Sequence, residues 1–248
     1  MNNLDLADRL SAARNGGPKL STGGMADAVA SACDAYAIQR RVVEAVGPIG
    51  AFKTGRRPDQ DQIMAPIFRK DTRSSPAIFT RTEIDRIGIE LEVGFVIDRP
   101  LPDASDADFE RRARDRVSAV AALEIVDTRL SDIEMAPPLL RLADNQLNGG
   151  LVVGSPRRDW QDMDLTMVNA SLSLGSQTVL DGRADVPGGD AFATFCALAR
   201  MIGSHCGGLK PGQVVITGSL NGMPFIERGT PVRGWIDGLG DVAADFPT

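Results

Sequence analysis

The segment Ile87–Ile97, with the sequence IGIELEVGFVI, decides the fold class of this 248-residue chain. Successive side chains of a strand point to opposite faces, so the large apolar residues at the odd positions share one face. The other face carries Glu90 and Glu92, followed by Gly94 and Val96. This alternation predicts a β-strand with one face in a hydrophobic core and two carboxylates on the other.

Helical patterns precede this strand. Apolar residues recur at helical spacing over residues 4–13 and stop at Gly16, which predicts a first helix. Residues 16–24 predict a linker, because their Gly, Lys, Ser and Thr residues lack the order of a phosphate-binding loop. A second, longer helix is predicted to end at Gly47, with an apolar face made of Val29, Cys33, Tyr36 and Val43.

The chain beyond the strand mixes helices and strands. Capping residues and apolar spacing predict one helix that follows Ser105 and Asp106 and another over about residues 190–204. Short strands are predicted over residues 123–126 and 149–154. The first of these helices is predicted to carry Phe109, Ala113 and Val117.

Two dipeptides, Asp181-Gly182 and Asn221-Gly222, each lie between runs of strand-forming residues. Both tolerate the positive φ of tight turns, so two β-hairpins are predicted. Helices come first, and the later chain is a largely antiparallel β body with one embedded helix. This order predicts an α+β fold. No break in composition divides residues 1–248, so we expect a single domain whose residues 1–48 form an N-terminal helical segment.

The composition excludes several classes of protein. The chain is 43% hydrophobic and 24% charged, which is typical of a globular domain and not of a disordered or fibrous chain. No apolar run approaches the roughly 18 residues of a membrane-spanning helix. The 27 basic residues against 33 acidic ones give a net charge of −6, the opposite of what binding a nucleic-acid backbone requires. We therefore expect neither a membrane nor a nucleic acid as partner.

The cysteines and the histidine restrict the chemistry further. Cys33, Cys196 and Cys206 are scattered and odd in number, which argues against a disulfide framework or a structural zinc site. Together with a start that has no secretory signal, they favour a reducing cytoplasm. Because His205 is the one histidine, a Ser-His-Asp or Cys-His mechanism must use it. We expect His205 to lie at a helix end and to face the last carbonyl groups of that helix.

The strongest chemical signal is the pair Glu90 and Glu92. Residues i and i+2 of a strand point the same way, with Cα atoms about 6.6 Å apart, so both carboxylates reach a common cation. A solvated strand face is the alternative, since antiparallel sheets often have one. The apolar or small residues Gly94 and Val96 farther along the same face weaken this alternative.

Two further segments carry polar groups in unusual places. Glu124 stands alone in the apolar run of residues 121–126, where a carboxylate is costly unless it is paired or bound to a metal. An ion pair with Arg129 is the structural alternative. The segment LADNQLNGG, residues 142–150, brings acid and amide groups next to two glycines, which allows a close approach of backbone to a ligand or simply forms a polar turn.

Four motifs occur along the chain in a fixed order: E-x-E on a strand, A-L-E-I-V-D-[ST]-R, A-D-N-x-x-x-G-G-x-V-x-G, and G-x-x-V-x-T-G-S-L. Together they resemble the 2-keto-4-pentenoate hydratase and 4-oxalocrotonate decarboxylase branch of the fumarylacetoacetate hydrolase superfamily. The resemblance covers most of the chain from about Ile49 to Asp241. It implies a mixed, largely antiparallel β-sandwich roll, with residues 49–248 as a metal-binding catalytic body.

The resemblance also implies a set of functional residues. A divalent cation, Mg²⁺ or Mn²⁺, is expected at Glu90, Glu92 and Glu124, and all-oxygen ligands suit these ions. Lys53 matches the lysine of the family's G-x-K-x-G segment and is expected to act in catalysis. Asp144 and Asn145 match the family's D-N pair and are also expected to act in catalysis. The residues expected to bind substrate are Asp71, Gly149, Gly150, Thr217 and Gly218.

The chain departs from the family pattern around these positions. The lysine segment reads AFKTG where the family has a sequence closer to G-W-K-I-G, and Gln146 stands where a small hydroxyl residue is common. Leu147 and Asn148 then replace the usual residues before the glycines. Because the metal ligands persist while the neighbouring residues vary, metal-dependent keto-acid chemistry is a safer expectation than any one substrate.

Three activities remain open at this stage. The first is a hydratase that adds water to 2-hydroxy-2,4-dienoates and gives 4-hydroxy-2-oxo acids. The second is a decarboxylase of 2-oxo dioic acids such as 4-oxalocrotonate, for which a cation such as Arg56 or Arg57 would hold the second carboxylate. The third is a keto-acid-binding homologue that has lost turnover and acts as a partner subunit. A homo-oligomer, with or without a partner enzyme from the same pathway, is expected in each case.

Overall fold

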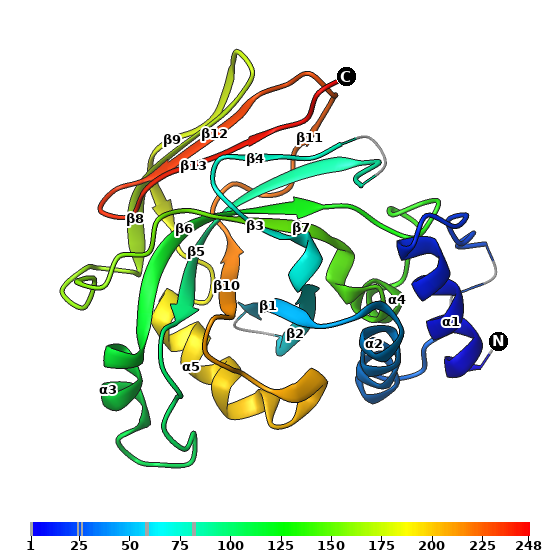
Figure 1. The fold of residues 1–248 in the computed structure, drawn as a ribbon, viewed down its shortest axis with the longest axis horizontal. Coiled ribbons are helices and arrows are strands. Elements are labelled where there is room, and N and C mark those ends of the chain that lie inside the picture. The colour runs from blue at the N-terminus through cyan, green and yellow to red at the C-terminus, as the bar shows by residue number, and fades with distance from the viewer. Residues whose placement is uncertain (1, 24, 26, 58–59, 81–82) are drawn as a thin grey trace.

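The computed structural model describes residues 2–23, 25, 27–57, 60–80 and 83–248. Two β-sheets lie against each other, and helices pack along the side of the larger sheet (Figure 1). The strands of the larger sheet are β1 (Ile49–Arg57), β2 (Gln60–Phe68), β3 (Thr72–Ser74), β5 (Ile87–Ile97), β6 (Val117–Val126), β7 (Asn148–Val153), β10 (Val214–Ser219) and β11 (Phe225–Ile226). Those of the smaller sheet are β4 (Ala77–Ile78), β8 (Met167–Leu174), β9 (Gln177–Asp185), β12 (Val232–Ile236) and β13 (Gly240–Asp245).

The larger sheet has the order β2-β1-β10-β5-β6-β7-β3, with β11 paired to β5, and the smaller has the order β4-β13-β12-β8-β9. Most neighbouring strands are antiparallel, and parallel pairs such as β1 with β10 make the fold mixed. The helices are α1 (Asn3–Arg14), α2 (Ala32–Val46), α3 (Phe109–Ala113), α4 (Pro138–Ala143) and α5 (Ala191–Ile202). Short 3₁₀ turns are η1 (Arg69–Asp71), η2 (Arg114–Arg116), η3 (Asn145–Leu147) and η4 (His205–Gly207). The predicted α+β class is confirmed.

The centre of the fold is the antiparallel pair of β5 and β6. Its odd-numbered β5 residues face the smaller sheet, as the sequence predicts, and the bounds of β5 are those predicted. The two sheets approach closely here, because a Cβ added at Gly234 of β12 would lie 2.9 Å from Leu91 and 3.5 Å from Leu123. This tight contact buries one face of β5 and β6 in the main hydrophobic core.

The opposite face of the larger sheet curls around a smaller apolar cluster. A Cβ at Gly94 would lie 3.2 Å from both a Val120 methyl group and the Val215 carbonyl oxygen, so β5 needs a glycine where it passes its neighbours. The buried residues of this cluster are Ala51, Ile67, Val120, Ala122, Leu151, Val214 and Ile216. The acidic side chains of β5 and β6 lie on this same face.

The predicted helices at residues 4–13 and about 190–204 are confirmed as α1 and α5. The side chain of Asp190 caps α5 by accepting a hydrogen bond from the Ala193 backbone N–H. The second predicted helix is α2, which begins after the capping residue Ser31, so Val29 lies before the helix. Of the predicted linker at residues 16–24, Gly24 lies outside the described residues.

One helix prediction is wrong in detail. Val117 does not belong to a helix, because α3 ends at Ala113 and Val117 begins β6, which is longer than the predicted strand at 123–126. Ser105 does not cap α3, since its backbone N–H and its hydroxyl both bond to the carboxylate of Asp103 in the preceding turn. Among the described residues, no side chain makes a capping hydrogen bond to α3.

Both hairpin predictions are also wrong. Asp181 and Gly182 lie inside β9, and the chain turns instead after Leu174, at Gly175 with a φ of +62°. Asn221-Gly222 connects β10 to β11, but both strands pair with β5 and not with each other. The partner strand, and not the local dipeptide, sets the turn in each case.

His205 does not face the end of its helix. It is buried, its Nε2 lies 2.9 Å from Oε1 of Gln39 on α2, and its ring packs against that of Tyr36. Burial, and then the nearby Arg40, lowers the pKa of His205 to about 4. His205 therefore joins η4 to α2 as a neutral side chain.

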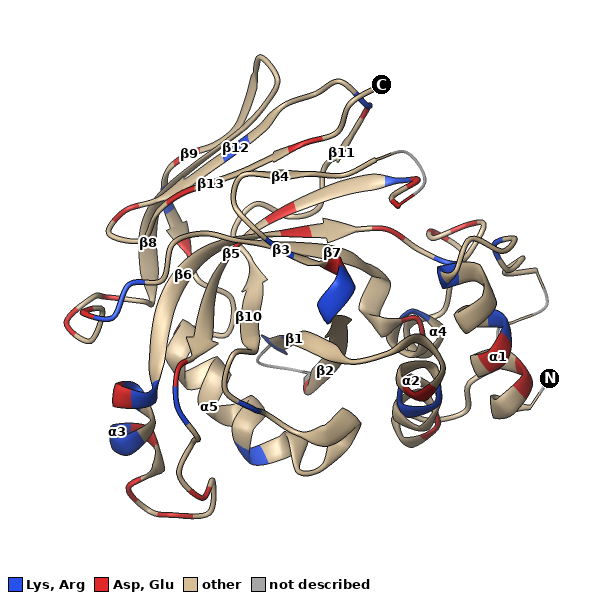
Figure 2. Cartoon of the chain, viewed as in Figure 1, with Lys and Arg blue, Asp and Glu red and all other residues tan. Residues whose placement is uncertain are grey.

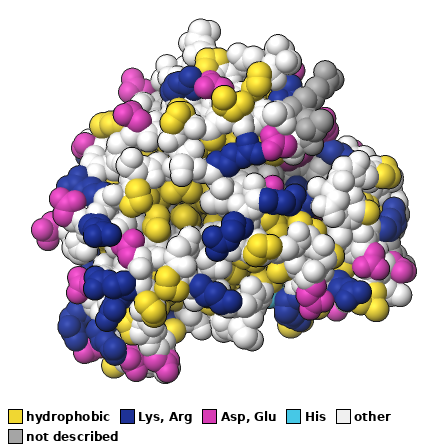
Figure 3. Space-filling model, viewed as in Figure 1, with side chains coloured by type: hydrophobic (Ala, Val, Ile, Leu, Met, Phe, Trp, Pro, Cys, Tyr) yellow, Lys and Arg dark blue, Asp and Glu magenta, His cyan; other side chains and the backbone are white. Residues whose placement is uncertain are grey.

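Charged residues are common on the helices and rare on the central strands of the larger sheet. They are frequent on α1, α2 and α3, whereas only acidic positions interrupt the central strands of the larger sheet (Figure 2). On the face shown in Figure 3, basic and acidic side chains are interspersed. Within the described residues, no helix is both long enough and apolar enough to span a membrane.

Candidate metal centre and active site

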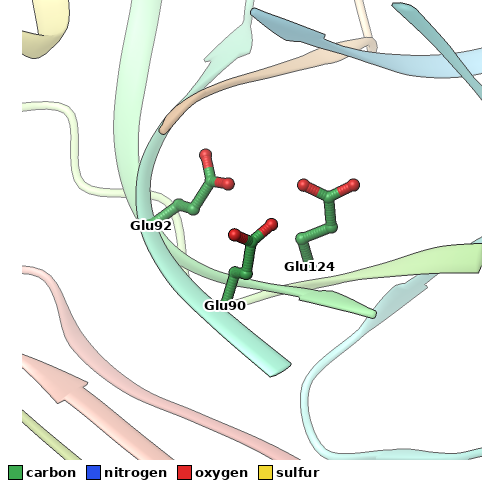
Figure 4. Close-up of side chains that lie close together, drawn as sticks. All are labelled: Glu90, Glu92 and Glu124. Carbon is green, nitrogen blue, oxygen red and sulfur yellow. The ribbon is translucent and has the colours of Figure 1, made fainter. Parts of the chain in front are cut away.

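Three glutamates converge on the curled face of the larger sheet. Glu90 and Glu92 project from the same side of β5, and the strand register places Glu124 of β6 directly opposite Glu90. One carboxylate oxygen from each residue lies within 4.8 Å of the others. Figure 4 shows that the three side chains point from two adjacent strands into a common space. The strand spacing predicted Glu90 and Glu92 as a pair and the family resemblance implied Glu124 as the third ligand, and the register places all three side by side.

Burial makes this cluster electrostatically unusual. Glu124 is fully buried and Glu92 is 2% exposed. Burial raises the pKa of Glu90 to about 7. Lys53 lowers this pKa and Glu124 raises it, and the attraction of Lys53 only partly opposes the effect of burial. Burial, then repulsion from Glu124 and Glu90, raises the pKa of Glu92 well above its usual value. A cation in the cluster would allow all three carboxylates to be ionised together.

Lys53 of β1 provides one positive charge to the cluster. Its Nζ lies 2.7 Å from Oε1 and 2.6 Å from Oε2 of Glu124, and 4.0 Å from Oε2 of Glu90. The same ammonium donates a hydrogen bond to the backbone carbonyl of Gln146, at 3.2 Å. Burial acts to lower the pKa of Lys53, but the three glutamates outweigh it and the net shift is upward. Lys53 is therefore a fixed cation at neutral pH.

Glu92 is oriented by the backbone at the end of β10. The N–H of Gly218 donates to Oε2 of Glu92 at 2.6 Å. Gly218 has a φ of +121°, and a Cβ there would lie 2.9 Å from Pro187, so both conformation and space require glycine. Its neighbour Thr217 is turned inward and donates to the carbonyl of Val93, so its role is to hold the strand in place.

A cavity of about 440 Å³ opens beside the glutamates. Its volume is in the range of small-molecule sites. The polar lining residues are Lys53, Thr54, Arg56, Glu90, Glu92, Arg141, Gln146 and Ser219. The remaining wall is made of Gly55, Ile63, Val126, Leu147, Pro187, Gly218, Gly222 and Met223. The cavity thus has an acidic end with Lys53 and an apolar wall.

Arg141 of α4 is held in position at this cavity. Its Nε donates to the carbonyl of Ala136 at 2.8 Å, and its Nη2 donates to the carbonyl of Glu134 at 3.1 Å. Its Nη1 makes no hydrogen bond to the described residues. Arg56 also lines the cavity, whereas the side chain of Arg57 lies outside the described part of the structure.

The predicted D-N pair is buried and does not line the cavity. Asp144 accepts hydrogen bonds from the Thr128 hydroxyl and from Nε of Arg129, the latter at 2.5 Å. Arg129 therefore pairs with Asp144, and the alternative in which it pairs with Glu124 is wrong. The side chain of Asn145 is also buried, and none of its polar atoms has a hydrogen-bond partner among the described residues.

Three of the residues predicted to bind substrate lie away from the glutamate cavity. Asp71 and Gly149 line a different cavity of about 610 Å³, which we call the second cavity. Gly150 packs against the ring of Phe79 and the carbonyl of Asp71. Both glycines lie where a Cβ would approach neighbouring atoms closely, 2.7 Å from Asp127 at Gly149 and 3.1 Å from Phe79 at Gly150.

The sequence indicated residues 142–150 as a segment that can approach a ligand, but Gln146 and Asn148 were not among the predicted site residues. Asn145, Gln146 and Leu147 all have left-handed φ values, of 49°, 50° and 64°. Such a run of residues other than glycine is strained, and strain of this kind is concentrated at functional sites. Here it turns the carbonyl of Gln146 toward Lys53 and leads directly into Asn148, whose side chain reaches Glu124. In the sequence, the further indication of this role was that Gln146, Leu147 and Asn148 differ from the residues common in the family.

Residues 33–246 match the Fumarylacetoacetate (FAA) hydrolase C-terminal family. The chain belongs to this family. A curated relative, the 2-keto-4-pentenoate hydratase of Paraburkholderia xenovorans (strain LB400), is 30% identical over 159 residues, which cover 64% of this chain and 58% of that protein. The match thus spans less than two thirds of the hydratase's length.

Two solved structures with bound divalent cations share the fold of this chain. The 4-oxalocrotonate decarboxylase from Pseudomonas putida G7, complexed with magnesium and adipate, has a TM-score of 0.81 and 19% identity, with coverage of 98% and 97% of the two chains. The fumarylpyruvate hydrolase from Pseudomonas aeruginosa, in complex with Mn²⁺ and pyruvate, has a TM-score of 0.60 and 17% identity, over 79% of this chain and 88% of that one.

The residues present in this chain fit a divalent metal ion. Three carboxylates offer hard oxygen ligands, and Oε2 of Glu124 is buried without a well-oriented hydrogen bond from the described residues. No histidine or thiolate belongs to the cluster. This donor set suits Mg²⁺ or Mn²⁺ rather than zinc or copper.

Proposed function

We propose that this chain is a divalent-metal-dependent hydratase, which adds water to 2-hydroxy-2,4-dienoates and yields 4-hydroxy-2-oxo acids. The observation that carries the proposal is the buried cluster of Glu90, Glu92 and Glu124 with Lys53 beside a ligand-sized cavity. The relatives named 2-keto-4-pentenoate hydratase support it. The substrate is then a small organic acid.

The protein's own groups would divide the work as follows. Glu90, Glu92 and Glu124 would hold Mg²⁺ or Mn²⁺, which supplies Lewis-acid stabilisation of negative charge on the substrate's C2 oxygen. Lys53 lies beside the glutamates and lines the cavity, so its ammonium would hold the substrate carboxylate or stabilise the developing oxyanion. The apolar wall, which includes Ile63, would receive the hydrocarbon chain.

An ultraviolet assay tests this proposal. Metal-stripped protein with 2-hydroxypenta-2,4-dienoate should show no loss of the dienoate chromophore until Mg²⁺ or Mn²⁺ is added. The Glu124→Gln variant should lose activity by more than about 100-fold, because it removes one ligand charge from the metal. Glu44→Gln, on the exposed surface of α2, is the matched control and should retain full activity. Metal binding without turnover would favour the alternative of a keto-acid-binding homologue.

A decarboxylase of 2-oxo dioic acids is the second candidate, and Arg141 is the observation that favours it. Its guanidinium is fixed by two backbone carbonyls and keeps Nη1 free of hydrogen bonds to the described residues, at a cavity that Arg56 also lines. A prepositioned guanidinium suits the second carboxylate of such a substrate. The hydratase substrate has no such group.

Replacing Arg141 separates the two candidates. Arg141→Met should raise KM for 4-oxalocrotonate by about 10- to 100-fold, the value of a charge-assisted hydrogen bond, and leave KM for 2-hydroxypenta-2,4-dienoate within about twofold. Arg200→Met, which removes an exposed arginine paired with Glu110, is the control. Equal effects on both substrates would remove Arg141 as a specificity residue.

The assembly and compartment are further proposals. We propose a single-domain homo-oligomer in the cytoplasm, with or without a partner enzyme from the same pathway, as the sequence predicts. Light scattering on purified protein measures its mass against the 26.4 kDa of one chain. A mass of one chain at micromolar concentration would contradict the oligomer.

A further inference from the structure

Asn148, the first residue of β7, contacts the metal cluster through its side chain. It is 1% exposed, and its Nδ2 donates to Oε1 of Glu124 at 2.8 Å. Lys53 donates to the same oxygen, so two donors fix the rotation of the Glu124 carboxylate. Because an amide oxygen facing a carboxylate would repel it, the amide group must present its N–H₂ side to Glu124.

The backbone of Asn148 is held in turn by two arginines. Its carbonyl oxygen accepts one hydrogen bond from Nη1 of Arg129, at 2.8 Å, and another from Nη2 of Arg14, at 2.9 Å. Charge-assisted hydrogen bonds to one carbonyl oxygen are strong and directional. They limit the freedom of a residue that directly follows the strained turn at Asn145–Leu147.

Each arginine is anchored by a different part of the chain. Arg129 is fixed by Asp144, whose carboxylate and carbonyl both accept its hydrogen bonds. Arg14 comes from the last turn of α1, and its guanidinium lies 4.9 Å from the centre of the Phe68 ring. Only 6% of the Arg14 side chain is exposed. Since the family match begins at residue 33, Arg14 lies outside the matched region.

We propose that Asn148 is a positioning residue for the metal ligand Glu124, and that Arg14 of α1 supports it from outside the family's common region. The proposal rests on the proposed metal site. It assigns a function to the N-terminal helix: α1 fixes the Asn148 carbonyl and so helps to orient the Glu124 carboxylate. Partners that orient metal ligands in this way typically change metal affinity by 10- to 100-fold when they are removed.

Isothermal titration with Mn²⁺ measures the effect without a substrate. Asn148→Ala should weaken Mn²⁺ binding by about 10- to 100-fold, and Arg14→Met should weaken it less, because Arg129 still holds the Asn148 carbonyl. Arg14→Lys keeps a positively charged donor and should recover part of the affinity. Circular dichroism establishes that each variant is folded at the titration temperature.

Arg114→Met is the matched control for Arg14→Met. Arg114 also donates to a backbone carbonyl, that of Gln161, and lies 5.1 Å from the centre of the Trp160 ring. It precedes β6, at the end of that strand farthest from Glu124. Arg114→Met should therefore lower thermal stability but leave Mn²⁺ affinity unchanged.

The outcomes separate this inference from the proposed function. If the wild-type protein binds no Mn²⁺, the proposed function fails and this inference fails with it. If the wild-type protein binds Mn²⁺ and both Asn148→Ala and Arg14→Met bind it equally well, only the inference is overturned. If Asn148→Ala does not fold, the comparison of Arg14→Met, Arg14→Lys and Arg114→Met decides the question.

Discussion

The glutamate cavity and the second cavity differ in how their charged side chains are paired. In the glutamate cavity, the buried carboxylates of Glu92 and Glu124 converge with the partly exposed one of Glu90. Lys53 is the cation within 4.0 Å of them among the described residues. The second cavity is larger, but its acids and bases are matched. Its charged lining residues are Arg14, Lys19, Lys70, Asp71, Glu83, Asp85, Asp127 and Arg129.

Ion pairs account for the charges of the second cavity. Lys19 lies 2.8 Å from Asp85 and 3.4 Å from Asp127, and Asp71 lies within 4.0 Å of both Arg14 and Lys70. Charges that are satisfied within the chain hold its segments together. Charges of one sign that crowd together require a ligand from outside. The pairing of charges at close range, and not the volume, therefore distinguishes the cavity that we propose to bind a ligand from the second cavity.

The largest expected change is a loss of metal affinity when a glutamate of the metal cluster is replaced. Glu92→Gln should weaken Mn²⁺ binding by more than about 100-fold, because it replaces a ligand. The same change should raise the melting temperature of the metal-free protein, since the burial and repulsion that raise the pKa of Glu92 no longer act. Calorimetry on metal-free and metal-loaded protein measures both effects. A lower melting temperature for the metal-free variant would contradict the view that the cluster is destabilising without a cation.

In the second cavity, the corresponding substitution is expected to lower stability and to leave metal affinity unchanged. Asp127 is buried and accepts hydrogen bonds from Lys19 and from the backbone N–H groups of Asp85, Arg86 and Thr128. Asp127→Asn should lower the free energy of unfolding by about 3 kcal/mol, because it removes a buried charge and places amide hydrogens against these donors.

Urea unfolding measures the loss of stability in Asp127→Asn, and Mn²⁺ titration of the folded variant provides the second measurement. The affinity should stay within about twofold of the wild type, since the carboxylate of Asp127 serves the fold and not the metal. A large loss of metal affinity with unchanged stability would reverse the roles that the comparison assigns to the two cavities.

The smallest change in stability concerns His205, a buried base beside the neutral amide of Gln39. The unfolded chain protonates its histidine near pH 6.5, whereas burial and Arg40 hold the pKa of folded His205 at about 4. This contribution to stability is complete above pH 6.5 and is lost as the pH falls toward 4. We expect a loss of about 2 kcal/mol over that range.

Because the chain has a single histidine, its nuclear magnetic resonance titration is unambiguous in tag-free protein. A midpoint near 6.5 in the folded protein would show that His205 is solvated, against its burial beside Gln39. His205→Leu should also flatten the pH dependence of unfolding between pH 4 and 6.5, if the variant folds.

The sequence predicted the elements whose signals are local. The strict alternation in Ile87–Ile97 marked β5 from end to end, and the apolar spacing over about residues 190–204 marked α5. The two hairpins failed because Asp181-Gly182 and Asn221-Gly222 are compatible with a turn without requiring one. The pairing of β9 with β8, and of both β10 and β11 with β5, involves residues far apart in the chain.

In the site, too, local motifs were predictable from the sequence and contacts between distant segments were not. Glu90, Glu92, Glu124 and Lys53 could be proposed from motifs, and the structure brings them together. The contact of Arg14 with Asn148 joins residues 134 positions apart, and no local pattern indicates it. Supporting contacts of this kind depend on how α1 docks, which a single sequence does not reveal.

The Asn221 side chain has a consequence for how this site can vary. Its amide donates to the carbonyl of Ile89 and accepts from the N–H of Leu91, so it takes the place of a backbone partner on both sides of Glu90. The neighbouring Gly222 and Met223, which line the cavity, belong to no strand and are thereby released from holding the sheet together. One asparagine lets this rim diversify in sequence toward new substrates while the metal strand keeps its shape.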